Sequence, residues 1–364
     1  MPIFAFTGSL TRPMPQYGAA NGRGLTQFGF DDDSGRLTLI GETGGIDDTG
    51  WLVLDPARRT LYTTCEITGA DRSSVAAFSV NDGGLAARGI QPTGGNEACH
   101  ASLSPDGRFL LVATYNGANP PGAPDAAVTV YPMASGTPGA AIARVSHEGS
   151  GPNRERQTAA HAHCVIASPD GRFVYVADLG MDRLVVYALG TDGSLTPKPE
   201  NDYALPPGLG PRHLVFHPDG RLLFLVSELI PTVMSLAVDP TTGVLSPRSS
   251  VPIAPPGDGI VQPAGIVLTP DARFLFVSLR VSNDILGLAV DARTGALTQT
   301  GRWPSGGATP RDLALSPSGR HLLVANQDSD AISVFRVDQQ RGTLSGPTHN
   351  QPVGTPMTIK LAAF

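Results

Sequence analysis

Short apolar runs recur along the chain, and most of them begin directly after a turn built on proline. The turn reads Ser-Pro-Asp-Gly-Arg at 104–108 and again at 168–172, and related phrases bring the copies to six. The run from Phe173 to Ala177 is hydrophobic at every position, as in a strand covered on both faces. Asp-Gly between β-branched and aromatic runs is a strong hairpin signal. The pattern therefore predicts hairpins of buried strands.

The six copies follow one another at a nearly constant distance. The repeat prolines are 49, 64, 49, 52 and 47 residues apart, at Pro56, Pro105, Pro169, Pro218, Pro270 and Pro317. A period near 50 residues indicates a repeat architecture, which takes precedence over a domain count from chain length. No segment shows helical periodicity over 11 or more residues.

A second signature, an apolar strand followed by Gly-x-Leu or a close variant, occurs seven times. Around Pro169 the two signatures together predict strands at about 163–168, 172–178, 183–189 and 195–200. Four antiparallel strands per repeat in seven repeats describe an all-β fold, the seven-bladed β-propeller. The whole chain, 1–364, is then a single domain.

Six proline phrases against seven Gly-x-Leu tails leave one repeat incomplete. Residues 355–361 match the strand that precedes a proline phrase, and residues 3–8 match the strand that follows one. We therefore expect the ring to be closed by one blade that combines the C-terminal strand, innermost, with the N-terminal strand beside it. Such a closure leaves no open sheet edge.

Composition narrows the classes of function. The net charge is −6 without any basic run, which argues against nucleic acid as a partner, and no apolar stretch approaches the length of a membrane span. The first residues lack the pattern of a signal peptide, and three scattered cysteines favour a reducing compartment. We expect a cytoplasmic protein, a monomer or a weak homo-oligomer, without a cofactor.

The repeat makes equivalent positions comparable. Counted from the repeat proline, position −6 begins the first strand of a hairpin and position +10 ends the second, so both lie at one end of the hairpin. Six of the twelve residues at these positions are ionisable, where about two would be expected by chance: His163, Arg212 and Arg311 at −6, and Glu66, Glu228 and Arg280 at +10. We interpret them as a functional cluster at one channel mouth, rather than as solvated strand ends.

The chemistry of this cluster suits an anionic ligand. Arginine gives forked, persistent donors to carboxylate or phosphate, and His163 can carry a proton near neutral pH. Glu228 could orient His163, act as a base or balance charge. A metal pair of His161 and His163 is disfavoured because neighbouring arginines would repel a cation. Histidines 100 and 213 are expected to point away from the channel.

The long step of 64 residues marks an extra loop at about 146–160 that leads into the strand of His163. Long loops at such places are often functional. Arg154, Arg156 and Gln157 are candidates for a rim over the anion site, beside Gln327 at position +10 and His161. A solvated, charged loop is the alternative.

Four stretches carry a resemblance to a known family: Gly-Pro-Asn-Arg-Glu-Arg-Gln at 151–157 with His-Ala-His at 161–163, Gly-Pro-Arg-His at 210–213, Ser-Glu-Leu at 227–229 and Asn-Gln-Asp-Ser at 326–329. Over nearly its whole length the chain resembles the lactonase family of seven-bladed propellers. That family includes 6-phosphogluconolactonases and carboxymuconate cyclases. Ala160 stands where the family usually has proline. The resemblance implies a metal-independent active site of His163, Arg212, Glu228 and Arg280.

The leading hypothesis is hydrolysis of an anionic sugar lactone in carbohydrate metabolism, with 6-phosphogluconolactone as the default substrate. His163 and Glu228 would provide acid-base catalysis, and Arg212, Arg280 and Arg311 would hold the anion and polarise the carbonyl. One alternative is a cycloisomerase that closes a muconate-type dicarboxylate into a lactone with the same groups. The other is a non-catalytic binding propeller.

Overall fold

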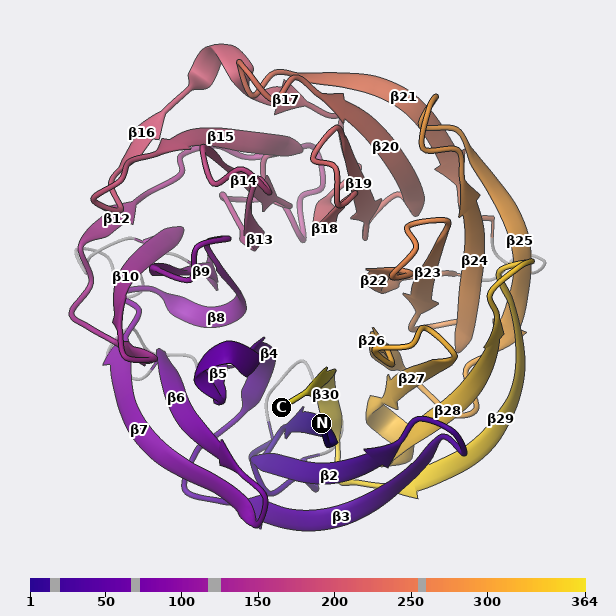
Figure 1. Cartoon of the computed structure of the whole chain (residues 1–364). Helices are drawn as coiled ribbons and strands as arrows, with labels where there is room; N and C mark the ends of the chain where they lie inside the picture. The colour runs from indigo at the N-terminus through magenta and orange to yellow at the C-terminus, as the bar shows by residue number, and fades with distance from the viewer. Residues whose placement is uncertain (14–19, 67–72, 117–125, 255–259) are drawn as a thin grey trace.

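A computed structural model describes residues 1–13, 20–66, 73–116, 126–254 and 260–364. Seven antiparallel sheets surround a central axis like the blades of a propeller (Figure 1). Within the described residues the only helical elements are the 3₁₀ turns η1 (Pro56–Arg58), η2 (Pro199–Asn201) and η3 (Gln327–Ser329). The predicted fold, an all-β propeller of seven four-stranded blades, is confirmed.

The strands are given blade by blade, from the channel outward. The first blade is β4 (Thr49–Asp55), β5 (Thr60–Cys65), β6 (Ser74–Asn81) and β7 (Gly84–Pro92). The second is β8 (Asn96–Leu103), β9 (Phe109–Asn116), β10 (Val128–Ala134) and β11 (Thr137–Pro138), with β12 (Ala143–Val145) also on β10. The third is β13 (Ala162–Ala167), β14 (Phe173–Asp178), β15 (Arg183–Leu189) and β16 (Leu195–Pro197), with β17 (Tyr203–Ala204) also on β15.

The remaining four blades have uninterrupted outer strands. The fourth is β18 (Pro211–Phe216), β19 (Leu222–Ser227), β20 (Thr232–Val238) and β21 (Leu245–Pro252). The fifth is β22 (Pro263–Leu268), β23 (Phe274–Leu279), β24 (Asp284–Val290) and β25 (Leu297–Pro304). The sixth is β26 (Pro310–Leu315), β27 (His321–Asn326), β28 (Ala331–Asp338) and β29 (Thr343–Pro352). The seventh is β30 (Pro356–Ala363), β1 (Ile3–Ser9), β2 (Leu25–Asp31) and β3 (Arg36–Thr43).

The seventh blade closes the ring as predicted. Its innermost strand, β30, pairs antiparallel with β1, for example through Ala5 opposite Leu361. The two chain ends consequently lie close together beside the channel (Figure 1). This pairing joins the two ends of the chain within one blade and so closes the ring.

The proline phrases form the turns between first and second strands. In the second blade the Asp106 carboxylate accepts hydrogen bonds from Ser104 Oγ (2.6 Å) and from the Arg108 backbone N–H (3.0 Å), and Gly107 takes a φ of +65°. One prediction needs adjustment: the strand expected at 195–200 ends at Pro197 and gives way to η2. Pro197 and Pro199 lack the N–H that a continuing ladder needs.

Adjacent blades are held together by buried apolar side chains between their faces. Phe4 and Phe6 of the seventh blade, for instance, belong to one cluster with Leu61 and Phe78 of the first. Cys65, Cys99 and Cys164 are buried free thiols. The core is thus distributed around the ring, and it keeps the innermost strands in place around the channel.

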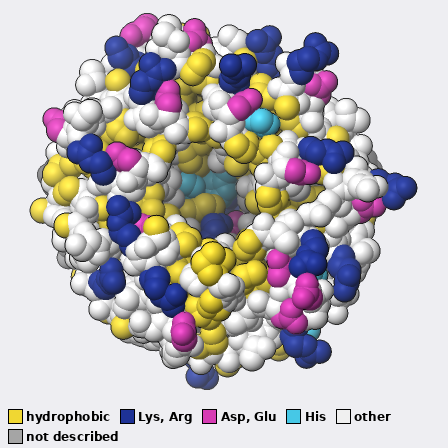
Figure 2. All heavy atoms as spheres, viewed as in Figure 1, with side chains coloured by type: hydrophobic (Ala, Val, Ile, Leu, Met, Phe, Trp, Pro, Cys, Tyr) yellow, Lys and Arg dark blue, Asp and Glu magenta, His cyan; other side chains and the backbone are white. Residues whose placement is uncertain are grey.

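The channel has two different ends. One end is a funnel of about 650 Å³ with aliphatic walls that include Leu54, Leu103 and Leu268. Figure 2 shows hydrophobic side chains around the central opening, with histidine side chains visible at its depth. The other end carries all six ionisable residues that the repeat comparison selected. Within the described residues, no helix is long and apolar enough to cross a membrane.

Candidate active site

A β-bulge near the start of every innermost strand turns one residue toward the channel. In the third blade Ala162 pairs with Asp178 and Cys164 with Ala177, so His163 between them has no partner in the ladder. Arg212 and Arg311 likewise have no partner in the ladders of their own blades. A bulge re-aims a side chain, and bulges are frequent beside active sites. Position −6 is therefore the place in each repeat where the bulge directs a side chain into the channel.

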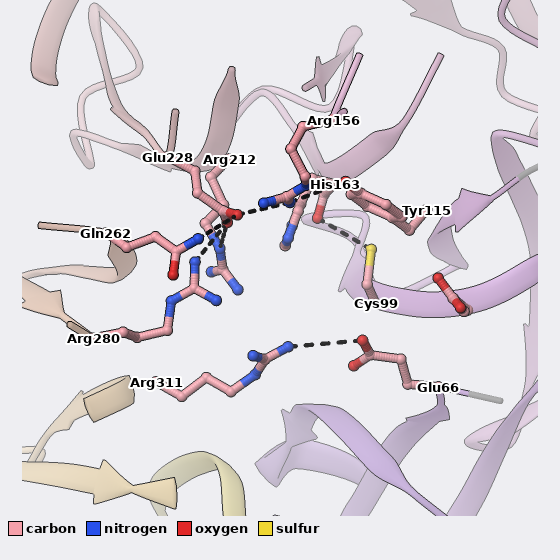
Figure 3. A pocket seen from close by; sticks show the side chains of 11 residues that line it. Glu66, Cys99, Tyr115, Arg156, His163, Arg212, Glu228, Gln262, Arg280 and Arg311 are labelled. Atoms are coloured by element: carbon pink, nitrogen blue, oxygen red, sulfur yellow. Dashed lines mark hydrogen bonds and ion pairs between the residues drawn. The ribbon is translucent and has the colours of Figure 1, made fainter. Parts of the chain in front are cut away.

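The bulged residues and the ends of the second strands enclose a cavity of about 420 Å³ at the polar end of the channel (Figure 3). Seven of the eleven residues predicted for the site line it: Glu66, Arg156, His163, Arg212, Glu228, Arg280 and Arg311. The repeat positions −6 and +10 thus converge on one cavity, as the sequence predicted.

Glu228 lies at the centre of the arginine cluster. Its Oε2 accepts a hydrogen bond from Arg212 Nε at 2.9 Å and lies 2.8 Å from Arg280 Nη2, while Oε1 accepts one from Arg156 Nη2 at 2.9 Å. Burial alone would raise the pKa of this carboxyl, but Arg280 and Arg212 outweigh burial and hold the pKa well below its usual range. Glu228 is therefore a permanent carboxylate that orders three guanidinium groups.

His163 is a buried imidazole with only 7% of its surface exposed. Burial and the charge of Arg212 hold its pKa well below the usual value, so the ring is uncharged at neutral pH. Its Nδ1 has no hydrogen-bond partner among the residues that the structure describes. An uncharged imidazole at a cavity wall can accept a proton.

A second acid-arginine pair lies across the cavity from Glu228 (Figure 3). Arg311 Nη2 lies 3.7 Å from Glu66 Oε1, and both side chains are nine-tenths or more buried. Four arginines and the carboxylates Glu66, Glu97 and Glu228 line the cavity, so positive charge is in excess. An anionic ligand would be favoured there.

The loop after β12 brings Arg156 to the cavity. Gln157 is fully buried, and its Nε2 donates to the Leu179 carbonyl and to Asp182, each at 2.8 Å. Asn153 Oδ1 accepts the backbone N–H of Arg156 at 3.1 Å. These bonds fix the loop, so that the Arg156 side chain reaches Glu228. The loop is thus structured, and of its three candidate residues Arg156 reaches the cavity.

The other four predicted residues lie outside the cavity lining. Arg154 is exposed on the loop, and Gln157 is buried behind it. Gln327 is also buried, with its Nε2 bound to Asp328. The ring of His161 stacks on Tyr115 at 4.4 Å, and its Nδ1 lies 2.9 Å from the Tyr115 carbonyl.

Four lining residues were not selected from the sequence as site residues: Glu97, Cys99, Tyr115 and Gln262. Tyr115 Oη lies 3.2 Å from Arg156, and Gln262 Nε2 donates to Glu228 at 3.4 Å. Cys99 and Tyr115 occupy positions −6 and +10, but neither is charged. Glu97 and Gln262 both stand at −8, two residues before the bulge, so extending the repeat comparison would have found them.

The expectation for two other histidines is wrong. His100 and His213 do not point away from the channel: both line the apolar funnel, and their rings lie 5.5 Å apart. The bulge explains this error, because it directs the residue after position −6 toward the channel axis as well. Across the described residues, no three His, Cys, Asp or Glu side chains gather in a way that could hold a metal ion.

Comparison with known proteins agrees with this architecture. The model of the family described as "Lactonase, 7-bladed beta-propeller" matches residues 5–361, so the chain belongs to this family of lactone-hydrolysing enzymes. A 6-phosphogluconolactonase of Formosa agariphila is 29% identical over 346 residues, 93% of this chain and 94% of that protein. One from Pectobacterium carotovorum is 30% identical and covers 91% and 93%.

Solved structures show the same similarity. The periplasmic gluconolactonase of Pseudomonas aeruginosa superposes with a TM-score of 0.89 at 30% identity, covering 100% of this chain and 99% of that one. The family resemblance that the sequence motifs indicated is therefore confirmed over nearly the whole chain.

Proposed function

We propose that this enzyme hydrolyses an anionic sugar lactone, with 6-phosphogluconolactone as the first substrate to test. One observation carries the proposal: four guanidinium groups converge with an uncharged imidazole in a cavity of about 420 Å³. Arginine matches phosphate and carboxylate geometry, and a neutral imidazole can accept a proton from water. Relatives named 6-phosphogluconolactonase support the choice of substrate.

In the proposed mechanism His163 takes a proton from a water molecule as its oxygen adds to the lactone carbonyl carbon. Arg212, Arg280 or Arg311 stabilises the oxyanion that forms, and the others hold the anionic substituent. The ring C–O bond then breaks, and the imidazolium returns the proton to the alkoxide leaving group. The step consumes one water and yields a hydroxy acid without a metal ion.

The role of Glu228 in this mechanism follows from its partners. A carboxylate held by Arg156, Arg212 and Arg280 is a weak base, since protonation would cost it three ionic hydrogen bonds. We therefore assign to Glu228 the ordering of the guanidinium groups, and to His163 the proton transfer. The chemistry needs only protein side chains and water, so we expect full activity after removal of divalent cations.

A substrate panel tests the proposal. We expect hydrolysis of 6-phosphogluconolactone to exceed that of glucono-1,5-lactone by at least about tenfold in kcat/KM, because the phosphate adds a charge-assisted contact. The rates should be equal with and without EDTA. Turnover of carboxymuconate without lactone hydrolysis would favour the cycloisomerase, and no turnover of any compound would favour a binding propeller.

A location in the cytoplasm stays a prediction, as does a monomeric or weakly associating state.

A further inference from the structure

A layer of rings from three innermost strands lies next to the candidate active site. The residue after the bulge is Trp51 in the first blade, His100 in the second and His213 in the fourth. All three line the apolar funnel, and Trp51 and His213 also line a pocket of about 10 Å³ directly under His163, Arg212 and Arg311. We call this layer of Trp51, His100 and His213 the channel floor, and two of its members line both the small pocket and the funnel.

His213 is the member of the floor that touches both candidate catalytic groups. Arg212 Nη1 lies 3.1 Å from Nε2 and 3.3 Å from Nδ1 of His213. Nearly equal distances to both ring nitrogens place Nη1 against the face of the imidazole, not along one lone pair. The ring of His163 meets the ring of His213 edge-on, with centroids 5.2 Å apart and planes at 71°.

The rest of the floor fixes the His213 ring. Trp51 and His100 make edge-on contacts with it at 4.9 and 5.5 Å, and Lys360 Nζ lies 4.0 Å from the centre of the Trp51 ring. His213 itself is 4% exposed. Burial, Arg212 and the neighbouring groups His163, His100 and Lys360 all lower its pKa, so the ring stays uncharged. An uncharged aromatic face attracts a guanidinium, whereas an imidazolium would repel it.

We infer that His213 is a positioning residue: its face supports Arg212 and its edge supports His163, so it sets the distance between the anion-binding and proton-transferring groups. This inference rests on the proposed function. Small displacements of such groups are costly, since a shift of about 1 Å can lower a rate about a hundredfold. The property that matters is the flat ring of His213, not its hydrogen-bonding nitrogens.

Two substitutions separate these properties. His213→Phe keeps the flat ring and should keep kcat/KM for 6-phosphogluconolactone within about threefold of the wild type. His213→Leu removes the ring and should lower kcat/KM about ten- to a hundredfold, chiefly through kcat. Leu103→Ala is the control, because Leu103 lines the same funnel but is not part of the channel floor. It should stay within about threefold of the wild-type rate.

Crystal structures of the two His213 variants provide a readout that is independent of activity. We expect Arg212 or His163 to move by about 1 Å in His213→Leu and neither to move in His213→Phe. Unchanged positions in His213→Leu, or a shift without loss of kcat, would overturn the inference, as would equal losses in both variants. If the wild type hydrolyses no lactone, the proposed function fails, and the two crystal structures alone decide the role of His213.

Discussion

Arg156 Nη2 lies 2.9 Å from Glu228 Oε1, although the two residues are 72 positions apart and come from different blades. The contact joins the extra loop to the end of β19 and adds a third arginine to the carboxylate. The loop therefore helps to hold the Glu228 carboxylate, which a fully solvated loop would not do.

Replacing Arg156 should therefore weaken the enzyme more than replacing its neighbour on the same loop. A hydrogen bond to a charged group contributes about 1.5–3 kcal/mol, so Arg156→Gln should lower kcat/KM for 6-phosphogluconolactone about ten- to a hundredfold. Arg154→Gln, at an exposed position, should leave it unchanged. Steady-state kinetics of both variants at one ionic strength measures the difference. Equal effects would mean that the loop acts only through its net charge.

Removing the charge of Glu228 should lower the free energy of unfolding as well as the activity. In Glu228→Gln the 3%-exposed Arg212 side chain loses its carboxylate, and an unpaired buried charge costs about 3–5 kcal/mol. Asp82→Asn is the control, because Asp82 pairs with Arg59 at an exposed position and should cost less than about 1 kcal/mol. Urea unfolding followed by circular dichroism gives both values. A stable Glu228→Gln protein would contradict the central place of this carboxylate.

The free energy of unfolding should fall as the solution becomes moderately acidic. The pKa values of His100, His163 and His213 are lowered in the folded state, that of His100 to about 3, mainly by burial and next by nearby cations. Burial also lowers the pKa of His321. Below pH 6.5 these histidines are protonated in the unfolded chain but stay uncharged in the folded chain. Each of them therefore lowers the free energy of unfolding by up to about 1.4 kcal/mol per pH unit. Glu228 adds nothing to this slope above its ordinary range, because both states keep it ionised there, and at lower pH its lowered pKa adds to the loss.

Urea titrations at pH values between about 5 and 7.5 test this expectation. His100→Phe should make the slope of unfolding free energy against pH shallower, since it removes one of the histidines that take up a proton only on unfolding. A slope that is unchanged in this variant, or a stability that rises on acidification, would contradict the lowered pKa values of these histidines.

Much of this protein could be predicted from sequence because the fold is repetitive. The seven Gly-x-Leu tails predicted the blade number, and the match of residues 355–361 and 3–8 to strands of other blades predicted the closure. Comparing equivalent positions selected His163, Arg212, Glu228, Arg280 and Arg311 before any coordinates. Differences among otherwise similar repeats carried the information about the site.

The rest could not be predicted because it depends on local backbone geometry. Strict alternation would put the residue after position −6 on the opposite face, which is why His100 and His213 were expected to point away from the channel. The bulge breaks that alternation, and no feature of the local sequence predicts the bulge. Likewise, the burial of Gln157 and the exposure of Arg154 follow from hydrogen bonds to Leu179 and Asp182, which are distant from the loop in sequence.

The most direct test of the account is the rate of 6-phosphogluconolactone hydrolysis by His163→Gln, corrected for spontaneous hydrolysis. General base catalysis contributes about 10²–10⁴-fold, so kcat should fall by that factor while the circular dichroism spectrum stays that of the wild type. A folded His163→Gln enzyme with a kcat within about threefold of the wild type would contradict proton transfer by His163.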